Sequence, residues 1–129
     1  MLVIDDSYNA QPPSMRVAIA TAAELAANSK ARLVMVLGDM LELGALSASS
    51  HDEAINAVVA AHPGLFIAVG PEMTSALART HVSGDKYLSA PNSDEAARLI
   101  AGRLRRGDVV LVKGSLGMDM DRVVASLAG

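Results

Sequence analysis

The sequence predicts a three-layer α/β fold, in which a mostly parallel sheet of about five or six strands is covered by helices on both faces. Short β-branched runs alternate with longer helical stretches along the whole chain, the order that builds parallel sheets with right-handed crossovers. The core also has to be built from Val, Leu, Ile, Met and Ala, because only three of the 129 residues are aromatic. We expect a single domain over residues 1–129, since this length suffices for one core.

The predicted strands are apolar throughout and lack the in-and-out alternation of a half-exposed antiparallel sheet. Such runs are typical of strands that are covered on both faces. The strands are expected at residues 2–5, 32–37, 65–69, 86–89 and 108–112.

Five helices are expected between and after these strands, at residues 14–28, 50–61, 72–80, 93–105 and 118–127. Two of them have a capping pair at the start, with the acidic residue three positions after the polar one: Ser50 with Glu53, and Asn92 with Glu95. Prolines stand where the first turn of a helix tolerates them, at Pro12, Pro13 and Pro71.

Composition excludes several classes of protein. The absence of cysteine excludes a disulfide framework, a Cys-based zinc site and a thiol nucleophile. A net charge of −3 and the scarcity of aromatic residues argue against nucleic-acid binding. The one basic cluster, Arg103-Leu104-Arg105-Arg106, is interpreted as the exposed face of the fourth helix. The apolar runs are too short to span a bilayer and no secretory signal is evident, so a cytoplasmic protein is expected. It is also expected to be a monomer.

The candidate site lies where the predicted strands end, because ligands of open parallel sheets bind beyond the carboxyl ends of the strands. Polar residues are concentrated there, at 5–11 after the first strand, at 38–44 after the second and at 113–115 after the last. Their carboxylates and ammonium group suit a ribose, a Mg²⁺ ion or an amino-acid substrate. The alternative that loops of any α/β domain are polar stays open on spacing alone.

Common motifs for catalysis are absent. Lys113 is preceded by Val112 rather than Gly, so no phosphate-binding P-loop is formed, and neither G-x-G-x-x-G nor G-x-S-x-G occurs. His62 and His81 are interpreted as surface residues. A signalling receiver module would also have an acidic pair and a lysine, as at Asp5-Asp6 and Lys113, but the third strand ends without an acceptor aspartate, which excludes it.

Three motifs together carry a resemblance to a known family. They are DDSYNAQP at residues 5–12 with Ser14-Met15-Arg16, VLGDMLELG at 36–44, and LVKGS at 111–115 with Gly117-Met118. In this order, at the ends of the first, second and last strands, they resemble the C-terminal, glutamate-ligase-type domain of a Mur ligase. Within that family they are most similar to the ligases that add D-alanyl-D-alanine to UDP-N-acetylmuramoyl-tripeptide. A related Mur-type amino-acid ligase domain and a stand-alone non-catalytic binding module are the alternatives.

The resemblance implies a Rossmann-like domain of a three-domain, ADP-forming ligase of peptidoglycan synthesis. An N-terminal domain that binds the UDP-sugar peptide and a central domain that holds ATP and Mg²⁺ would lie outside this chain. ATP would convert the substrate carboxylate to an acyl phosphate, which the amine of D-alanyl-D-alanine attacks. The isolated domain is therefore expected to be inactive, with no catalytic residue, metal site or bound cofactor of its own.

The resemblance also assigns residues. Asp6 matches the aspartate that approaches the ATP ribose, and Tyr8 and Asn9 match the same nucleotide-binding loop. The expected substrate-binding residues are Asp39, Glu42, His51, Lys113 and Ser115. For Asp39 and Glu42 two roles stay open, orientation of the dipeptide ammonium or capping of the following turn.

The sequence departs from the family pattern at four positions. The family usually has Asn at Gln11, an acidic residue at Pro13, and basic residues at Leu116 and Asp119. The last two differences remove positive charge beside Lys113, which makes the local charge less favourable for an anionic end of a substrate.

Overall fold

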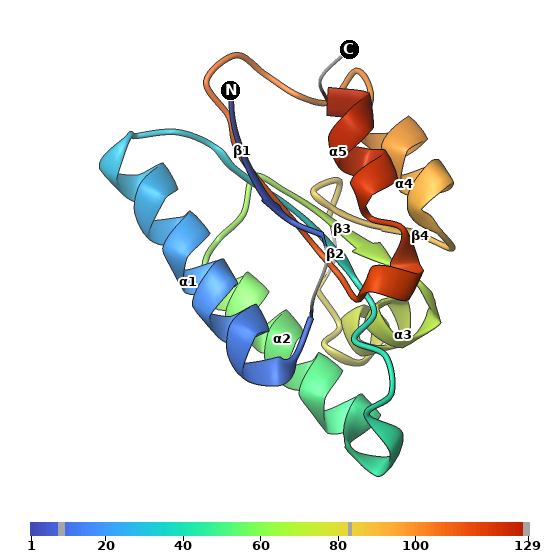
Figure 1. Cartoon of the computed structure of the whole chain (residues 1–129). Helices are drawn as coiled ribbons and strands as arrows, with labels where there is room; N and C mark the ends of the chain where they lie inside the picture. Colours follow the sequence, from blue (N-terminus) through green and yellow to red (C-terminus); the bar gives the residue numbers. More distant parts are fainter. Residues whose placement is uncertain (8–9, 83, 128–129) are drawn as a thin grey trace.

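The computed structural model, which describes residues 1–7, 10–82 and 84–127, contains one five-stranded parallel sheet (Figure 1). The strands are β1 (Leu2–Asp6), β2 (Leu33–Gly38), β3 (Leu65–Val69), β4 (Tyr87–Ala90) and β5 (Val109–Lys113). The helices are α1 (Pro12–Asn28), α2 (Ser47–Ala60), α3 (Pro71–Arg79), α4 (Ser93–Ile100) and α5 (Asp121–Leu127), with 3₁₀ turns η1 (Gly44–Leu46) and η2 (Leu116–Met118). Within these ranges no helix is long and apolar enough to cross a membrane. The predicted fold class is confirmed.

The order of the strands in the sheet is β1-β5-β2-β3-β4. Strand β5 is therefore inserted between β1 and β2, which are consecutive in the chain. The register pairs Asp6 with Lys113 on one side of β5, and Leu37 with Lys113 on the other. The last residues of β1, β5 and β2 consequently lie side by side, and this is the point at which an open α/β sheet usually binds its ligand.

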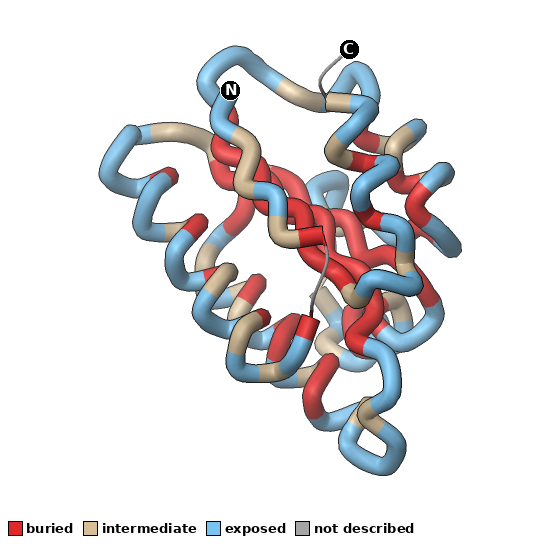
Figure 2. The backbone as a smooth tube through the Cα atoms, viewed as in Figure 1, coloured by how far each residue is buried: buried red, intermediate tan, exposed pale blue. Residues whose placement is uncertain are grey.

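Two apolar layers sandwich the sheet. Helices α1, α2 and α3 cover one face, where they pack on alternate strand residues such as Met35 and Leu37. Helices α4 and α5 cover the other face and pack on the intervening residues, such as Val34 and Val36. Figure 2 shows the result as a continuous band of buried backbone through the central strands. This double cover explains why these strands show no polar alternation.

The two outer strands are less buried than their sequence predicts. Strands β2, β3 and β5 are buried at every position, but β1 and β4 are largely half-buried or exposed. Leu2 is 49% exposed although it belongs to an apolar run. The reason is topological, because an outer strand has a neighbour on one side only, and apolar composition alone does not reveal the position of a strand in the sheet.

The starts of two helices test the capping prediction. Asn92 caps α4, since its Oδ1 accepts a hydrogen bond of 2.9 Å from the amide of Glu95, as the spacing predicted. Ser50 does not cap α2, because that helix already begins at Ser47, after η1. The prediction for Ser50 was wrong: the 3₁₀ turn carries the chain into the helix without a side-chain cap.

The fourth helix is shorter than predicted. It ends at Ile100 rather than at residue 105, because Ala101 leaves the helical conformation and Gly102 adopts a positive φ of 79°. Arg103, Arg105 and Arg106 therefore lie in the loop before β5, and their interpretation as an exposed helix face was wrong. The last helix likewise begins at Asp121 rather than near 118, after η2 and a left-handed Asp119.

Candidate functional site

The candidate site is formed at the carboxyl end of the sheet, by which we mean the last residues of the strands and the residues that follow them. Lys113, at the end of β5, places its Nζ 2.5 Å from Oδ2 of Asp6, at the end of the neighbouring β1. The Lys113 side chain is 1% exposed, whereas that of Asp6 is 41% exposed. The pair therefore fixes the Asp6 carboxylate on a buried cation and leaves part of it open to a ligand.

The turn after β1 continues this arrangement. One carboxylate oxygen of Asp5 accepts a hydrogen bond of 3.1 Å from the amide of Ser7, which bends the chain at the strand end. Ser7 is buried, and its hydroxyl has no hydrogen-bond partner among the residues that the structure describes. The predicted nucleotide-binding residues Tyr8 and Asn9 lie outside the described residues.

Asp39, directly after β2, caps α3. Its two carboxylate oxygens accept hydrogen bonds from the amides of Met73, at 2.7 Å, and Glu72, at 3.2 Å. A negative charge is favourable at this position because the amides and the dipole of the helix N-terminus both point at it. Asp39 is 2% exposed, so the structure favours the capping role, although it caps a helix over thirty residues away instead of the following turn.

Gly70 makes this cap possible. Its φ of 98° is a left-handed value that side chains rarely adopt, and a Cβ there would lie 2.6 Å from Oδ2 of Asp39. A glycine at the end of β3 thus lets the carboxylate approach the first turn of α3.

The loop after Asp39 is held by two further predicted residues. The buried His51 accepts a hydrogen bond of 2.9 Å from the Met40 amide at Nε2, so in its neutral form it carries the proton on Nδ1 and donates it to the Ser47 carbonyl at 2.7 Å. Ser115 accepts a hydrogen bond of 2.9 Å at Oγ from the Leu41 amide. Together they fix the position of the loop that carries Glu42.

Glu42 differs from the other predicted residues. It is exposed, and its backbone has a positive φ of 63°. Within the part of the chain that the structure describes, its carboxylate takes part in no ion pair or hydrogen bond. Of the two predicted carboxylates in this loop, Glu42 is the one that remains available to a ligand.

The residues that follow Lys113 pack against the loop after β2. The amide of Ser115 donates a hydrogen bond of 3.2 Å to the carbonyl of Asp39, so the chain after β5 runs against the chain after β2. A Cβ at Gly114 would lie 2.6 Å from Cγ of the buried Met120 and 3.3 Å from Cα of Gly38. The glycine therefore permits this close approach.

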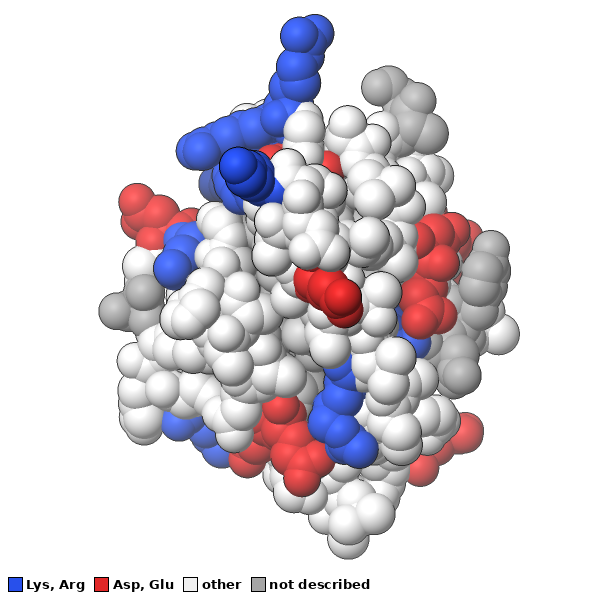
Figure 3. All heavy atoms as spheres, turned by 90° about the vertical axis from the view of Figure 1, so that its left-hand side faces the viewer, with Lys and Arg blue, Asp and Glu red and all other residues white. Residues whose placement is uncertain are grey.

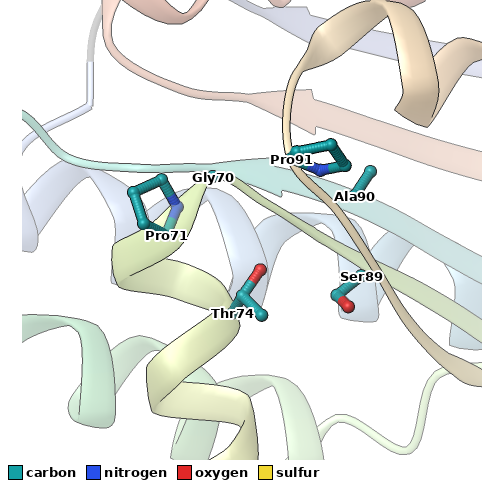
Figure 4. Close-up of a pocket in the computed structure, with 6 residues that line it drawn as sticks. All are labelled: Gly70, Pro71, Thr74, Ser89, Ala90 and Pro91. Atoms are coloured by element: carbon teal, nitrogen blue, oxygen red, sulfur yellow. The ribbon is translucent and has the colours of Figure 1, made fainter.

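A hollow of about 360 Å³ lies farther along the same end of the sheet, between the start of α3 and the end of β4 (Figure 4). Pro71 and Thr74 line it from α3, and Ser89, Ala90 and Pro91 line it from the other side. The sequence does not indicate this hollow, because small, uncharged residues at the start of a helix and the end of a strand carry no chemical signal. Its lining has no charged side chain, so it suits only a small, largely apolar group.

The chemistry available at this end is binding and orientation. Among residues 1–7, 10–82 and 84–127, no three His, Asp or Glu side chains are grouped so that they could hold a metal ion. The Asp6 carboxylate can accept hydrogen bonds from hydroxyl groups, and Glu42 can accept them from an ammonium group.

Comparisons with known proteins agree with this description. The family model described as "Mur ligase, glutamate ligase domain" matches residues 1–116. A UDP-N-acetylmuramoyl-tripeptide--D-alanyl-D-alanine ligase from Treponema pallidum is 37% identical over 92% of the chain, and one from Bacillus subtilis is 33% identical over 97%. The chain covers 26% and 27% of these relatives, and so spans about a quarter of their length.

Solved structures show the same relationship. A MurF ligase from Thermotoga maritima in complex with ADP matches 96% of the chain with a TM-score of 0.73 and 26% identity. A MurF from Acinetobacter baumannii matches 97% with a TM-score of 0.76 and 30% identity, and the chain covers 27% of each. The fold, the positions of the motifs and the match to the family model lead to one conclusion: this chain belongs to the Mur ligase family, as its glutamate ligase domain.

Proposed function

We propose that this chain acts as the C-terminal domain of an ATP-dependent, ADP-forming ligase that joins D-alanyl-D-alanine to UDP-N-acetylmuramoyl-tripeptide in the cytoplasm. The relatives that carry this name support the proposal, as does the bound ADP in the Thermotoga maritima structure. The observation that carries it in this chain is the Asp6–Lys113 pair, a half-exposed carboxylate fixed at the point where the strand order reverses.

In this proposal Asp6 accepts hydrogen bonds from the ribose hydroxyls of ATP, and Tyr8 and Asn9 contact the nucleotide from the same loop. Lys113 keeps the Asp6 carboxylate oriented, since its ammonium faces that carboxylate at 2.5 Å. The phosphates and Mg²⁺ are held by the central domain of the complete enzyme.

Glu42 is the proposed contact of the incoming amine. Asp39, His51 and Ser115 act on it indirectly, because their hydrogen bonds fix the loop from residue 39 to residue 43. When the domain closes on the other two, this loop would orient the dipeptide and exclude water from the acyl phosphate, which water would otherwise hydrolyse.

A chimera tests this function. The chain would replace the matching region of the Bacillus subtilis relative, and ADP release would be measured with ATP, UDP-N-acetylmuramoyl-tripeptide and D-alanyl-D-alanine. We expect ADP release that depends on the dipeptide from the chimera, and none from the 129-residue chain or from the relative truncated before that region. A folded chimera that releases no ADP, or an isolated chain that does, would contradict the proposal.

A further inference from the structure

The cations of the chain fall into two groups. Outside the loops that precede the strands, every Lys or Arg forms an ion pair: Arg16, Arg79, Arg98, Lys113 and Arg122. In the loops that precede the strands, which we call the amino end of the sheet, Arg32 alone does so. Within the described ranges, the cations of that end that lie beyond ion-pair distance of any carboxylate are Lys30, Lys86, Arg103, Arg105 and Arg106.

Positive charge is therefore concentrated at the amino end. Six cationic side chains lie there with two acidic ones, Asp85 and Asp108, although the whole chain has a net charge of −3. Figure 3 shows Lys and Arg side chains gathered at one end of the molecule, the upper end in that view. In Figure 1 the loop before β5 crosses the sheet at this end, beside the first residue of β1.

A buried ion pair gives this end a fixed framework. The Arg32 guanidinium donates to both carboxylate oxygens of Asp108, at 3.0 and 2.7 Å, and to the carbonyl of Arg103 at 2.7 Å. Asp108, whose side chain is 1% exposed, also accepts a hydrogen bond of 2.7 Å from the Arg105 amide. Gly64 leaves room for Arg32, because a Cβ there would lie 2.3 Å from Cγ of that arginine.

This framework borders a hollow of about 380 Å³. The loop before β5 contributes Arg103 and Arg105 to its lining, and Lys86, the residue before β4, lines it as well. Arg32 also lines it, with its charge balanced by Asp108, and Asp85 is the carboxylate in the lining. Among the described residues, the other three cations of the lining lie beyond ion-pair distance of any carboxylate: Arg103 donates to the Leu99 carbonyl at 2.6 Å, and the Lys86 Nζ lies 5.7 Å from the centroid of the Tyr87 ring. These neutral partners leave both positive charges unbalanced beside the hollow.

We propose that this hollow binds a compact anion that carries two phosphate groups. Guanidinium groups bind phosphate oxygens in pairs, and a lysine adds a mobile point charge, so this set of side chains suits phosphate better than a single carboxylate. The volume admits a diphosphate, and a concave, polar lining favours a small ligand over a flat membrane or a nucleic acid. The site lies at the opposite end of the sheet from Asp6 and does not depend on the proposed ligase function.

Titration of the 129-residue chain with inorganic pyrophosphate tests the proposal, by calorimetry and by amide shifts in NMR spectra at low salt. We expect one saturable site, with the largest shifts in residues 61–65, 84–87 and 101–107. The double variant Lys86→Gln/Arg105→Gln should weaken binding at least tenfold. Both side chains are exposed, so the fold should be retained, and circular dichroism would check this.

A matched control separates a built site from general attraction. The double variant Arg98→Gln/Arg122→Gln removes the same charge from exposed positions elsewhere and should change pyrophosphate affinity less than twofold. An equal loss in this control, or titration without saturation, would overturn the proposal. Anionic phosphatidylglycerol vesicles or duplex DNA that bind the chain through Lys86 and Arg105, without saturable pyrophosphate binding, would also overturn it.

Discussion

The two ends of the sheet use an ion pair in opposite ways. At the amino end, Asp108 is almost fully buried and Arg32 is 20% exposed, so the pair acts as a framework for the loop before β5. At the carboxyl end, Lys113 is buried but Asp6 is 41% exposed, so the pair presents a carboxylate to solvent. Burial of the carboxylate, rather than the presence of the pair, therefore separates a structural ion pair from one that is available to a ligand.

Helix direction explains part of the charge separation between the ends. Because each strand is followed by a helix, helices begin near the carboxyl end and run back to the amino end. Acidic residues stand in first turns, as at Glu72, Asp94 and Asp121, and basic residues in last turns, as at Arg79 and Arg98. This distribution matches the helix dipoles. The helix dipoles do not account for the cations of the loop before β5, because these cations lie beyond the last turn of α4.

The largest effect is expected from Asp108→Asn. Loss of the carboxylate leaves the Arg32 guanidinium without its partner in a mostly buried position, which should lower the free energy of unfolding by about 3 kcal/mol. Urea unfolding followed by circular dichroism would measure it. Asp94→Asn breaks an exposed pair with Arg122 and should cost less than about 1 kcal/mol. An equal loss of unfolding free energy in the two variants would contradict the structural role of Asp108.

The two ends should also differ at their glycines. Gly70→Ala forces a side chain into a left-handed residue and against the Asp39 carboxylate, and should cost about 2–3 kcal/mol. Gly107→Ala has a similar φ of 87° but open space around it, and should cost about 1–2 kcal/mol. Unfolding free energies of both variants check this, and a Gly107 variant that is as unstable as the Gly70 variant would contradict it.

Low pH should reduce the stability that the ionised Asp108 contributes at the amino end. Burial raises the pKa of this carboxyl, but hydrogen bonds from the Arg32 guanidinium and the Arg105 amide outweigh it, so the pKa lies below the ordinary value of 3.8. Because the pKa of Asp108 is lower in the folded than in the unfolded state, this carboxyl stabilises the fold. Its contribution is fully present above pH 3.8 and is lost as the pH falls through the folded-state pKa. The stability advantage of the wild type over Asp108→Asn should therefore shrink below pH 3.8. A constant difference down to pH 2 would be inconsistent with this.

The smallest effect on stability is expected from Lys113→Met. Methionine replaces the buried chain of the lysine with one of similar size, and Asp6 remains partly hydrated, so the free energy of unfolding should change by less than about 1 kcal/mol. Thermal and urea unfolding would measure it. A loss as large as that of Asp108→Asn would make the Lys113 pair a structural framework as well and would abolish the contrast between the ends.

The fold was predictable because its signal is local. Runs such as 33–38 and 65–69 are apolar throughout, and a strand buried on both faces has no other pattern. The end of α4 had one signal in the sequence, Gly102, but Leu104 continues the apolar spacing of Ile100 and favoured a longer helix. The loop that follows is held by Asp108 and Arg32. These two residues are 76 positions apart, and spacing does not reveal such a contact.

The position of the candidate site could be predicted from the ends of the strands, but the hydrogen-bond partners of its residues could not. His51 and Ser115 were predicted as substrate contacts because they match motifs or follow a strand, and for Asp39 a substrate contact and a capping role both stayed open. In the structure their polar atoms bond to backbone groups, and only the three-dimensional arrangement of α3 and the loop after β2 shows this. The sequence shows that a polar side chain stands at a given position, but its hydrogen-bond partners decide whether it remains available to a ligand.

The proposed function requires that the Asp6 carboxylate at the carboxyl end contacts a nucleotide. Its most direct test is the Kd of a non-hydrolysable ATP analogue for the chimera that carries Asp6→Asn, compared with the same chimera carrying Asp94→Asn. Both substitutions neutralise a half-exposed carboxylate that is paired with a cation. We predict that Asp6→Asn weakens binding at least about tenfold, the loss of a charged hydrogen bond, while Asp94→Asn changes it less than about twofold. Equal affinities in the two variants would contradict the contact between Asp6 and the nucleotide.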